Sequence, residues 1–337
     1  MPARPYRDLS RCVLCEHRCG ADRLAGEEGV CRVTEPVVAS RCLHPAPPES
    51  YTVFLAGCNF KCLNCQNWSI AHYPDNGQPV EGYVEPAFLA RECVRYLESP
   101  DGRFMGADRI FFSGGEATIH LPYVEEIVAE ARGLRPGVKV NFDTNGFMTE
   151  QSLQRILAFA TSLTFDIKAF SDEVHRALTG APVDPVLRNA EILARRAPER
   201  IWEFRVLVIP GISDGEVEPM CRFLAGLGRD LPVCFLAFRP NFVLESHPGP
   251  GRELMERCVE AARQAGLRRA TWAGVTDVPG LAASEDPALR PFYRTVPARV
   301  AASAAAAAGC TTHPRDCYAC LSSRQCPVKR YVPVRQC

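Results

Sequence analysis

The chain has 337 residues, and its 39 Lys and Arg balance 39 Asp and Glu, so the formal charge is zero. This length fits one large α/β domain with small appendages, and the even charge excludes the basic surface that a nucleic-acid partner requires. No apolar run approaches the roughly 20 residues of a membrane span, and residues 1–10 carry charges without an apolar core, so we expect no membrane segment and no secretory signal.

Cysteine is unusually frequent and unevenly distributed. There are 17 Cys, an odd number, and most fall into three clusters. Clustered spacing without an export signal argues against a disulfide framework, and we therefore expect a reducing, low-oxygen cytoplasm. Four cysteines stand apart from the clusters and are predicted to be small core residues: Cys93, Cys221, Cys234 and Cys258.

The first cluster lies in residues 1–49 and comprises Cys12, Cys15, Cys19, Cys31 and Cys42. The first four of these have the spacing C-x2-C-x3-C-x11-C. Four thiolates can hold a zinc ion in a tetrahedron or ligate an iron–sulfur cluster, and ligand softness does not separate the two. Thiols without a metal are the alternative. We predict that residues 1–49 form a metal-binding segment.

Residues 50–275 alternate between short β-rich runs and helical patterns. We expect strands over residues 52–56, 109–113, 139–142, 163–167, 202–209 and 233–238. We expect helices over residues 86–98, 122–132, 149–159, 185–196, 215–227 and 252–265. Such alternation implies parallel strands with crossover helices, and six units suggest an α/β fold with a partial (β/α)6 barrel. A seventh strand near residues 268–272 would extend it, and a doubly wound open sheet is the competing architecture.

The second cysteine cluster directly follows the first expected strand. Cys58, Cys62 and Cys65 have the spacing C-x3-C-x2-C. Three thiolates on one loop can hold three irons of a four-iron cluster, which leaves the fourth iron open to a substrate. The alternatives are a zinc knot or redox-neutral thiols. The spacing resembles the radical S-adenosylmethionine (radical SAM) superfamily, which implies a 4Fe-4S cluster that binds S-adenosylmethionine and cleaves it reductively to a 5′-deoxyadenosyl radical.

The second expected strand ends in Ser113, Gly114, Gly115 and Glu116. Two glycines let the backbone approach a ligand closely, although a simple turn would use them equally well. The run resembles the Gly-Gly-Glu motif of the superfamily. The resemblance implies that backbone here contacts the methionyl amine of the cofactor and that Glu116 supports this site.

The third and fourth expected strands carry acids at their ends. Asp143, Thr144 and Asn145 precede a glycine, and Asp166 stands two residues before Lys168. Asn-Gly also favours a simple type I′ turn, and Lys168 has the alternative of pairing with an acid. Together these runs resemble the activating enzymes of glycyl-radical enzymes. The resemblance implies that Asp143, Thr144 and Asp166 help to hold a monovalent cation beside the cofactor, with Asn145 and Lys168 also at the cofactor.

Arg205 lies within the fifth expected strand, which ends in Pro210-Gly211. A charged residue inside a barrel strand needs a partner. The carboxylate of the cofactor is one candidate, and an ordinary Arg–Asp pair is the other. Each of these motifs falls at the carboxyl end of a strand or within it, and in β/α barrels chemistry gathers at the carboxyl ends.

The third cysteine cluster lies in residues 310–337, after a Pro/Ala-rich stretch over 276–309 that we expect to be a linker. Its members are Cys310, Cys317, Cys320, Cys326 and Cys337. The C-x2-C-x5-C portion resembles part of the SPASM-type tail of radical enzymes that modify peptides and proteins, which implies an auxiliary cluster. The usual close fourth Cys of that pattern is absent, and a zinc-stabilised tail is the alternative.

These resemblances lead to a functional prediction. The leader around Cys12–Cys31 resembles that of uncharacterised radical proteins related to pyruvate formate-lyase activating enzyme. With the tail, it implies hydrogen abstraction from a protein or peptide, supplied with electrons by a donor such as ferredoxin or flavodoxin. Two alternatives remain open. One is a radical SAM enzyme acting on a small molecule or nucleotide, and the other is a non-enzymatic zinc or iron–sulfur protein that senses or shuttles electrons.

Overall fold

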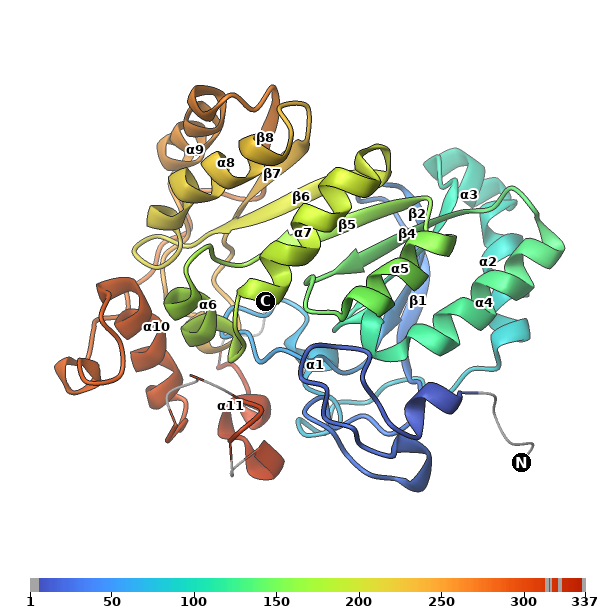
Figure 1. Ribbon diagram of the computed structural model, residues 1–337, viewed down its shortest axis with the longest axis horizontal. Coiled ribbons are helices and arrows are strands. Elements are labelled where there is room, and N and C mark those ends of the chain that lie inside the picture. The colour runs from blue at the N-terminus through green and yellow to red at the C-terminus, as the bar shows by residue number, and fades with distance from the viewer. Residues whose placement is uncertain (1–5, 313–314, 316, 321–322, 335–337) are drawn as a thin grey trace. The chain divides into compact units, whose positions relative to one another are not determined.

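The computed structural model describes residues 6–312, 315, 317–320 and 323–334. Its strands form one sheet whose neighbours follow chain order from β1 to β8 (Figure 1). The strands are β1 (Val38–His44), β2 (Ser50–Leu55), β3 (Arg109–Gly114), β4 (Lys139–Thr144), β5 (Ser162–Ile167), β6 (Ile201–Val208), β7 (Pro232–Ala237) and β8 (Arg269–Ala273). β1 pairs antiparallel with β2, whereas the pairs β2–β3, β3–β4, β6–β7 and β7–β8 are parallel.

Helices connect the parallel strands. They are α1 (Trp68–Ala71), α2 (Pro86–Leu97), α3 (Pro100–Met105), α4 (Leu121–Leu134), α5 (Glu150–Phe159), α6 (Asp172–Thr179), α7 (Asp184–Arg196), α8 (Val217–Leu227), α9 (Arg252–Ala265), α10 (Val296–Ala307) and α11 (Pro327–Arg330). Within the described residues, no helix has the length and apolar character needed to cross a membrane.

The prediction of an α/β fold is confirmed, and the mostly parallel eight-stranded sheet is consistent with the predicted partial barrel. A doubly wound sheet would reverse its strand order at a switch point, and the strictly sequential order excludes that alternative. The possible seventh strand near residues 268–272 is present as β8, which pairs parallel with β7. β1, an antiparallel strand within residues 1–49, was not predicted.

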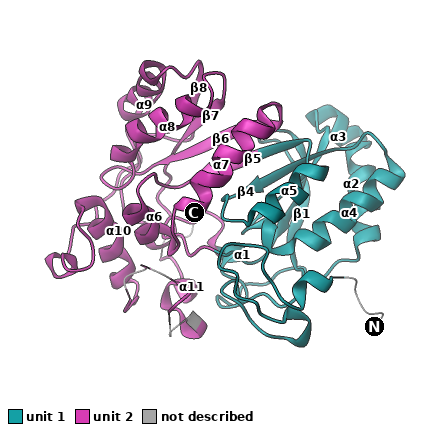
Figure 2. Cartoon of the chain, viewed as in Figure 1, with its two compact units in different colours: residues 1–59, 69–163 teal, residues 60–68, 164–337 magenta. Residues whose placement is uncertain are grey.

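The chain divides into two compact units (Figure 2). Unit 1 comprises residues 1–59 and 69–163. Its strands β2, β3 and β4 carry apolar side chains that are fully buried, as expected of parallel strands covered by helices. Their side chains pack with the inner faces of α2, α4 and α5, and the fully buried set includes Val53, Leu55, Ile110, Phe112, Val140, Phe142, Val124, Ile127, Leu153 and Ile156.

Unit 2 comprises residues 60–68 and 164–337. One apolar cluster in it joins Leu63, the inner face of α6, and the alanine face of α10. Four alanines on one face of α10 are fully buried: Ala298, Ala301, Ala302 and Ala305. Small side chains allow α10 to pack against α6, so residues 296–307 of the expected linker are a structural helix.

Buried histidines make the fold sensitive to acid. In unit 1, His120 is fully buried and its Nε2–H donates to the Ala56 carbonyl at 2.7 Å. Burial, with the Arg23 charge nearby, lowers the pKa of His120 to about 3. In unit 2, burial lowers the pKa of His175 to about 4. Both rings are therefore neutral in the folded state at the pH where an unfolded histidine, with its ordinary pKa of about 6.5, already takes up a proton.

We expect the free energy of unfolding to fall as the pH drops below about 6.5, because the unfolded chain then binds more protons than the folded chain. For His120 the loss between pH 7 and pH 5.5 is about 1 kcal/mol. The loss is measured by anaerobic denaturant unfolding of the unaltered protein and of His120→Gln at both pH values. Because the variant lacks this proton uptake, we expect its free energy of unfolding to fall by about 1 kcal/mol less than that of the unaltered protein. His44→Gln, on β1, is the control; equal pH dependence in all three proteins contradicts the prediction.

Candidate active site

The segment that leads into Cys58 is held by backbone groups of unit 1. Ala56 accepts the hydrogen bond from His120, and the Gly57 carbonyl accepts from the Glu116 amide at 3.0 Å. The Gly115 amide in turn donates to Leu55 at 2.8 Å. These bonds join the end of β2 to the Gly-Gly-Glu run after β3, so the first cysteine and this run form one fixed structure.

Cys58 is buried and has an amide beside its sulfur. The Asn145 Nδ2 group lies 3.8 Å from Cys58 Sγ and donates to Asn59 Oδ1 at 2.7 Å. The Asn59 carbonyl accepts from His17 at 2.8 Å, and that ring packs against Phe147. N–H groups directed at thiolate sulfur stabilise its negative charge and tune the potential of a bound cluster. Asn145 thus acts on the cysteine in this arrangement.

The other two cysteines of the loop belong to unit 2. Their segment is tied to the end of α6, where the Lys61 amide donates to Thr179 and the Leu63 amide donates to Leu178, at 2.9 and 3.0 Å. Burial raises the pKa of the Cys62 thiol to about 12, against the opposing charge of Lys168. Trp68, just beyond Cys65, stacks on Phe242 at 5.9 Å.

Glu116 is the best-connected acid of unit 1. Its Oε1 accepts from the amide and hydroxyl of Thr118, at 3.0 and 2.6 Å, and from Thr144 Oγ1 at 2.8 Å. Its Oε2 accepts from the Asn145 amide at 2.8 Å. Burial raises the pKa of Glu116, and the four donors oppose this effect. Because its carboxylate accepts four hydrogen bonds, Glu116 is suited to hold the loops after β3 and β4 together.

We expect Glu116→Gln to destabilise the protein by about 2 kcal/mol, because the new amide N–H2 faces a donor and leaves it without an acceptor. Thermal unfolding followed by circular dichroism measures the loss. Glu130→Gln is the matched control, because Glu130 is exposed on α4 of the same unit. Equal melting temperatures for the two variants would contradict the role assigned to Glu116.

The remaining predicted site residues have partners in the structure. In unit 1, Asp143 accepts from Ser113 Oγ at 2.6 Å. In unit 2, Lys168 Nζ pairs with Asp166 at 2.6 Å. Arg205 pairs with Glu203 at 2.6 Å, a glutamate and not the aspartate of the Arg–Asp alternative. The roles of Lys168 and Arg205 at the cofactor stay predictions. The monovalent cation site at Asp143, Thr144 and Asp166 stays a prediction.

One of the N-terminal cysteines, Cys12, lies beside a buried arginine in unit 1. Arg23 is 2% exposed, and its Nη1 donates to the Ile119 carbonyl at 2.6 Å and lies 3.9 Å from Cys12 Sγ. A hydrogen bond with Cys12 lowers the pKa of Cys19 to about 6, and burial raises that of Cys15 to about 12. Cys31 is buried as well. Thiols beside a buried guanidinium suit the negative charge of a thiolate-ligated metal.

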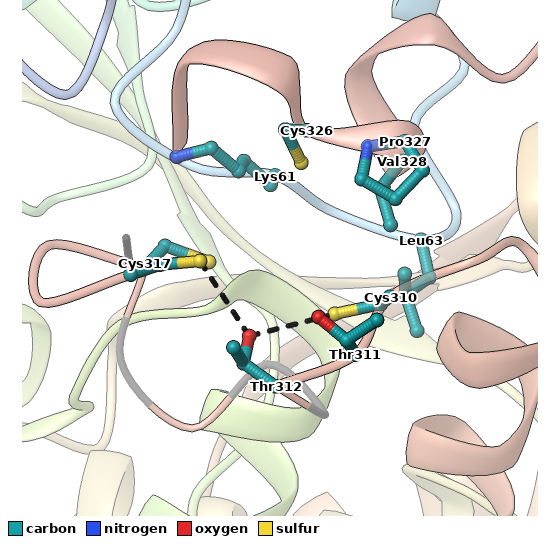
Figure 3. Close-up of a pocket in the computed structure, with 10 residues that line it drawn as sticks. Lys61, Leu63, Cys310, Thr311, Thr312, Cys317, Cys326, Pro327 and Val328 are labelled. Atoms are coloured by element: carbon teal, nitrogen blue, oxygen red, sulfur yellow. Dashed lines mark hydrogen bonds between the residues drawn. The ribbon is translucent and has the colours of Figure 1, made fainter. Parts of the chain in front are cut away.

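The C-terminal cysteines line one pocket of unit 2 (Figure 3). Its wall includes Cys310, Cys317, Cys320 and Cys326. Cys337 lies outside the described residues. All cysteines in the described part of the chain are free of disulfides. Within the same described ranges, no group of three or more His, Cys, Asp or Glu side chains is arranged to hold a single metal ion. The four scattered cysteines are buried, as predicted.

Comparison with known proteins identifies the chemistry of this loop. The family model described as the radical SAM superfamily matches residues 52–224, just over half of the chain. The chain belongs to the radical SAM superfamily. Membership makes it an enzyme that uses a 4Fe-4S cluster and S-adenosylmethionine, and three thiols within eight residues fit a cluster with one open iron.

Three relatives show which kinds of protein are similar to this chain in sequence. Uncharacterized protein MJ0808 of Methanocaldococcus jannaschii is 25% identical over 80% of this chain and 82% of its own length. The pyruvate formate-lyase-activating enzyme of Staphylococcus aureus is 27% identical over 50% of this chain and 65% of its own. The isethionate sulfite-lyase activating enzyme of Desulfovibrio desulfuricans is 30% identical, over 33% and 36%.

A solved domain of a pyruvate-formate lyase-activating enzyme from Bacteroides vulgatus aligns with 50% of this chain and 100% of its own. Its identity is 21% and its TM-score is 0.43.

Several residues at these sites were not predicted from the sequence. His17 lies inside the N-terminal cysteine motif and Arg23 between its third and fourth cysteines, yet a motif spacing does not reveal which side chains become buried beside the sulfurs. Lys61 immediately precedes Cys62, and an isolated lysine in a loop is expected to be exposed to solvent. Only the folded structure shows that these cations are buried.

Proposed function

We propose that this radical SAM enzyme abstracts hydrogen from a protein or peptide substrate, in the manner of an activating enzyme. The observation that carries the proposal is the union of the Cys58 segment with the Gly-Gly-Glu run, inside a chain that belongs to the superfamily. Relatives named as activating enzymes of other enzymes support a protein substrate.

Each part of the site has a role in this proposal. Cys58, Cys62 and Cys65 would hold three irons of the cluster. When bound, the cluster supplies the electron that cleaves S-adenosylmethionine to methionine and a 5′-deoxyadenosyl radical. Gly115 presents backbone to the methionyl group, and Glu116 keeps that backbone in place. Further cofactor contacts are proposed for residues at the ends of β3 to β6: Ser113, Gly114, Asp143, Asn145, Asp166, Lys168 and Arg205.

The two cysteine-rich ends are proposed as additional metal sites, each with zinc or an iron–sulfur cluster. In the N-terminal set, the buried Arg23 supports the proposal because it offers a positive charge beside Cys12. A ferredoxin or flavodoxin is the proposed electron donor. The many free thiols of the described residues suit the cytoplasmic location that we propose.

The test determines which class of molecule gives up the hydrogen atom to 5′-deoxyadenosine. Anaerobically reduced enzyme is incubated with S-adenosylmethionine and a deuterated proteome, which is separated by size into proteins and small molecules. We expect deuterium in 5′-deoxyadenosine with the protein fraction and none with the small-molecule fraction. Deuterium in 5′-deoxyadenosine only with the small-molecule fraction would refute a protein or peptide substrate. Absence of 5′-deoxyadenosine in every incubation would refute the proposed reaction.

A further inference from the structure

Two segments of the chain line the pocket at the C-terminal tail. The tail contributes the four thiols of Cys310, Cys317, Cys320 and Cys326. The loop that carries Cys62 and Cys65 contributes Lys61 and Leu63 (Figure 3). All of these residues belong to unit 2. The tail therefore meets the cysteine loop of the active site at this pocket.

Lys61 is the residue that needs an explanation. Its side chain is 4% exposed, and its ammonium group makes no hydrogen bond to any described residue. Burial of an ammonium group without a partner costs several kcal/mol. The described residues that line the pocket include thiols and hydroxyls but no carboxylate. The sulfurs are thus the groups in this pocket that can supply a balancing negative charge.

The position of the tail relative to Lys61 is fixed by one helix end. The carbonyls of the last turn of α6 accept from Lys61 and Leu63, as described above, and the next carbonyl, that of Gly180, accepts from the Cys317 amide at 2.9 Å. The final carbonyls of a helix have no partner within the helix, so they are natural anchors for other segments. Loop and tail are therefore held side by side on the same three residues.

The described thiols of the pocket are not arranged around one metal ion in this structure, but four thiols on one pocket supply the ligand set of a metal site. Metal binding converts thiols to thiolates, and four thiolates around a divalent ion carry two net negative charges. Thr312 also contributes, since its hydroxyl lies 3.7 Å from Cys310 Sγ and 3.6 Å from Cys320 Sγ (Figure 3). A hydroxyl or ammonium group beside thiolate ligands tunes and retains the metal.

We propose that Cys310, Cys317, Cys320 and Cys326 form a closed four-thiolate metal centre, and that Lys61 is its charge partner, linking this centre to the active-site loop. Zinc and an iron–sulfur cluster share this ligand chemistry. Four ligands complete the set without Cys337. This inference adds to the proposed function. It depends on the proposed function only for the catalytic role of the loop that carries Cys62.

The ligand set is tested by anaerobic iron, sulfide and zinc analysis of the full-length protein. We expect Cys320→Ser to lose either four irons with their sulfide or one zinc, which identifies the centre. Cys258→Ser, at a buried core cysteine of the same unit, and Cys337→Ser should lose neither. Unchanged metal content in Cys320→Ser, or loss in Cys337→Ser, would overturn the assignment. A melting temperature within a few degrees of the unaltered protein establishes that Cys320→Ser is folded.

The role of Lys61 is tested with Lys61→Met, which keeps the length of the side chain and removes its charge. We expect a chelator to release the C-terminal metal about tenfold faster from this variant, the usual effect of removing a partner of a metal ligand. Lys139→Met is the control, at an exposed lysine of β4. Equal release rates for the two variants would overturn the charge pairing.

Formation of 5′-deoxyadenosine is recorded for the same samples. Its absence in all of them, with the C-terminal metal present and released as expected, would refute the proposed function and leave this centre intact.

Discussion

We expect Cys62→Ala to reduce the formation of 5′-deoxyadenosine by at least about 10³-fold, equivalent to about 4 kcal/mol of activation free energy. The physical reason is ligand count. Three thiolates are the minimum that leaves one iron open while the other three are held, and alanine has no sulfur to replace the lost bond. The backbone hydrogen bonds of Lys61 and Leu63 to α6 do not depend on the thiol, so the loop itself stays in place.

The measurement is the yield of 5′-deoxyadenosine from reduced enzyme and S-adenosylmethionine, with iron analysis of the same protein. Cys221→Ala is the matched control, because Cys221 is 1% exposed within α8 and belongs to the core. We expect it to lose some stability and to keep the reaction. A Cys62→Ala protein with more than a tenth of the normal yield would refute the assignment of this cysteine to the catalytic cluster.

The second large effect is expected for Gly115→Ala. A Cβ atom at this position would overlap the Gly57 carbonyl oxygen, lie 2.7 Å from the carbonyl carbon, and lie 3.0 Å from the Ala71 Cα. All three are backbone atoms, which cannot turn aside as a flexible side chain can. The two loops would have to separate, and we expect a loss of about 3 kcal/mol in stability and of at least about 10²-fold in cofactor cleavage.

Denaturant unfolding and the yield of 5′-deoxyadenosine measure these effects. Gly133→Ala is the control, because a Cβ at Gly133 meets no atom within 4 Å and the residue is exposed near the end of α4. There we expect a gain of about 0.5–1 kcal/mol, since alanine favours helix over glycine. Similar behaviour of the two variants would show that the close approach of Gly115 to Gly57 does not hold in solution.

The parallel strands could be predicted from the sequence because each is a short run rich in β-branched, aromatic and other apolar residues that alternates with a helical pattern. All seven expected strands, including the one near residue 270, lie within two residues of those observed. β1 was missed because its sequence mixes polar residues such as Ser40 and Arg41 with apolar ones, as an edge strand does. α6 was missed because it has only eight residues and few apolar positions.

Site residues could be predicted from the sequence where their role depends on spacing along the chain. They could not be predicted where their role depends on becoming buried in the folded protein. The spacing of Cys58, Cys62 and Cys65 gave the family, which the comparisons confirm. Glu203, the partner of Arg205, was not predicted, although it lies two residues earlier on the same face of the strand. Lys61 could not be read in this way, since its burial depends on a tail some 250 residues away in the chain.

The alanine-rich helix α10 has a consequence for shortened forms of this protein. Its buried alanines complete the core beneath α6, so removal of the chain from Val296 onward would uncover that helix and invite aggregation. A stop codon after Gly309 would leave the alanine helix but remove the five C-terminal cysteines together with Val328, a buried member of the same apolar cluster. A shortened form that keeps the core of unit 2 therefore needs the tail as well as the alanine helix.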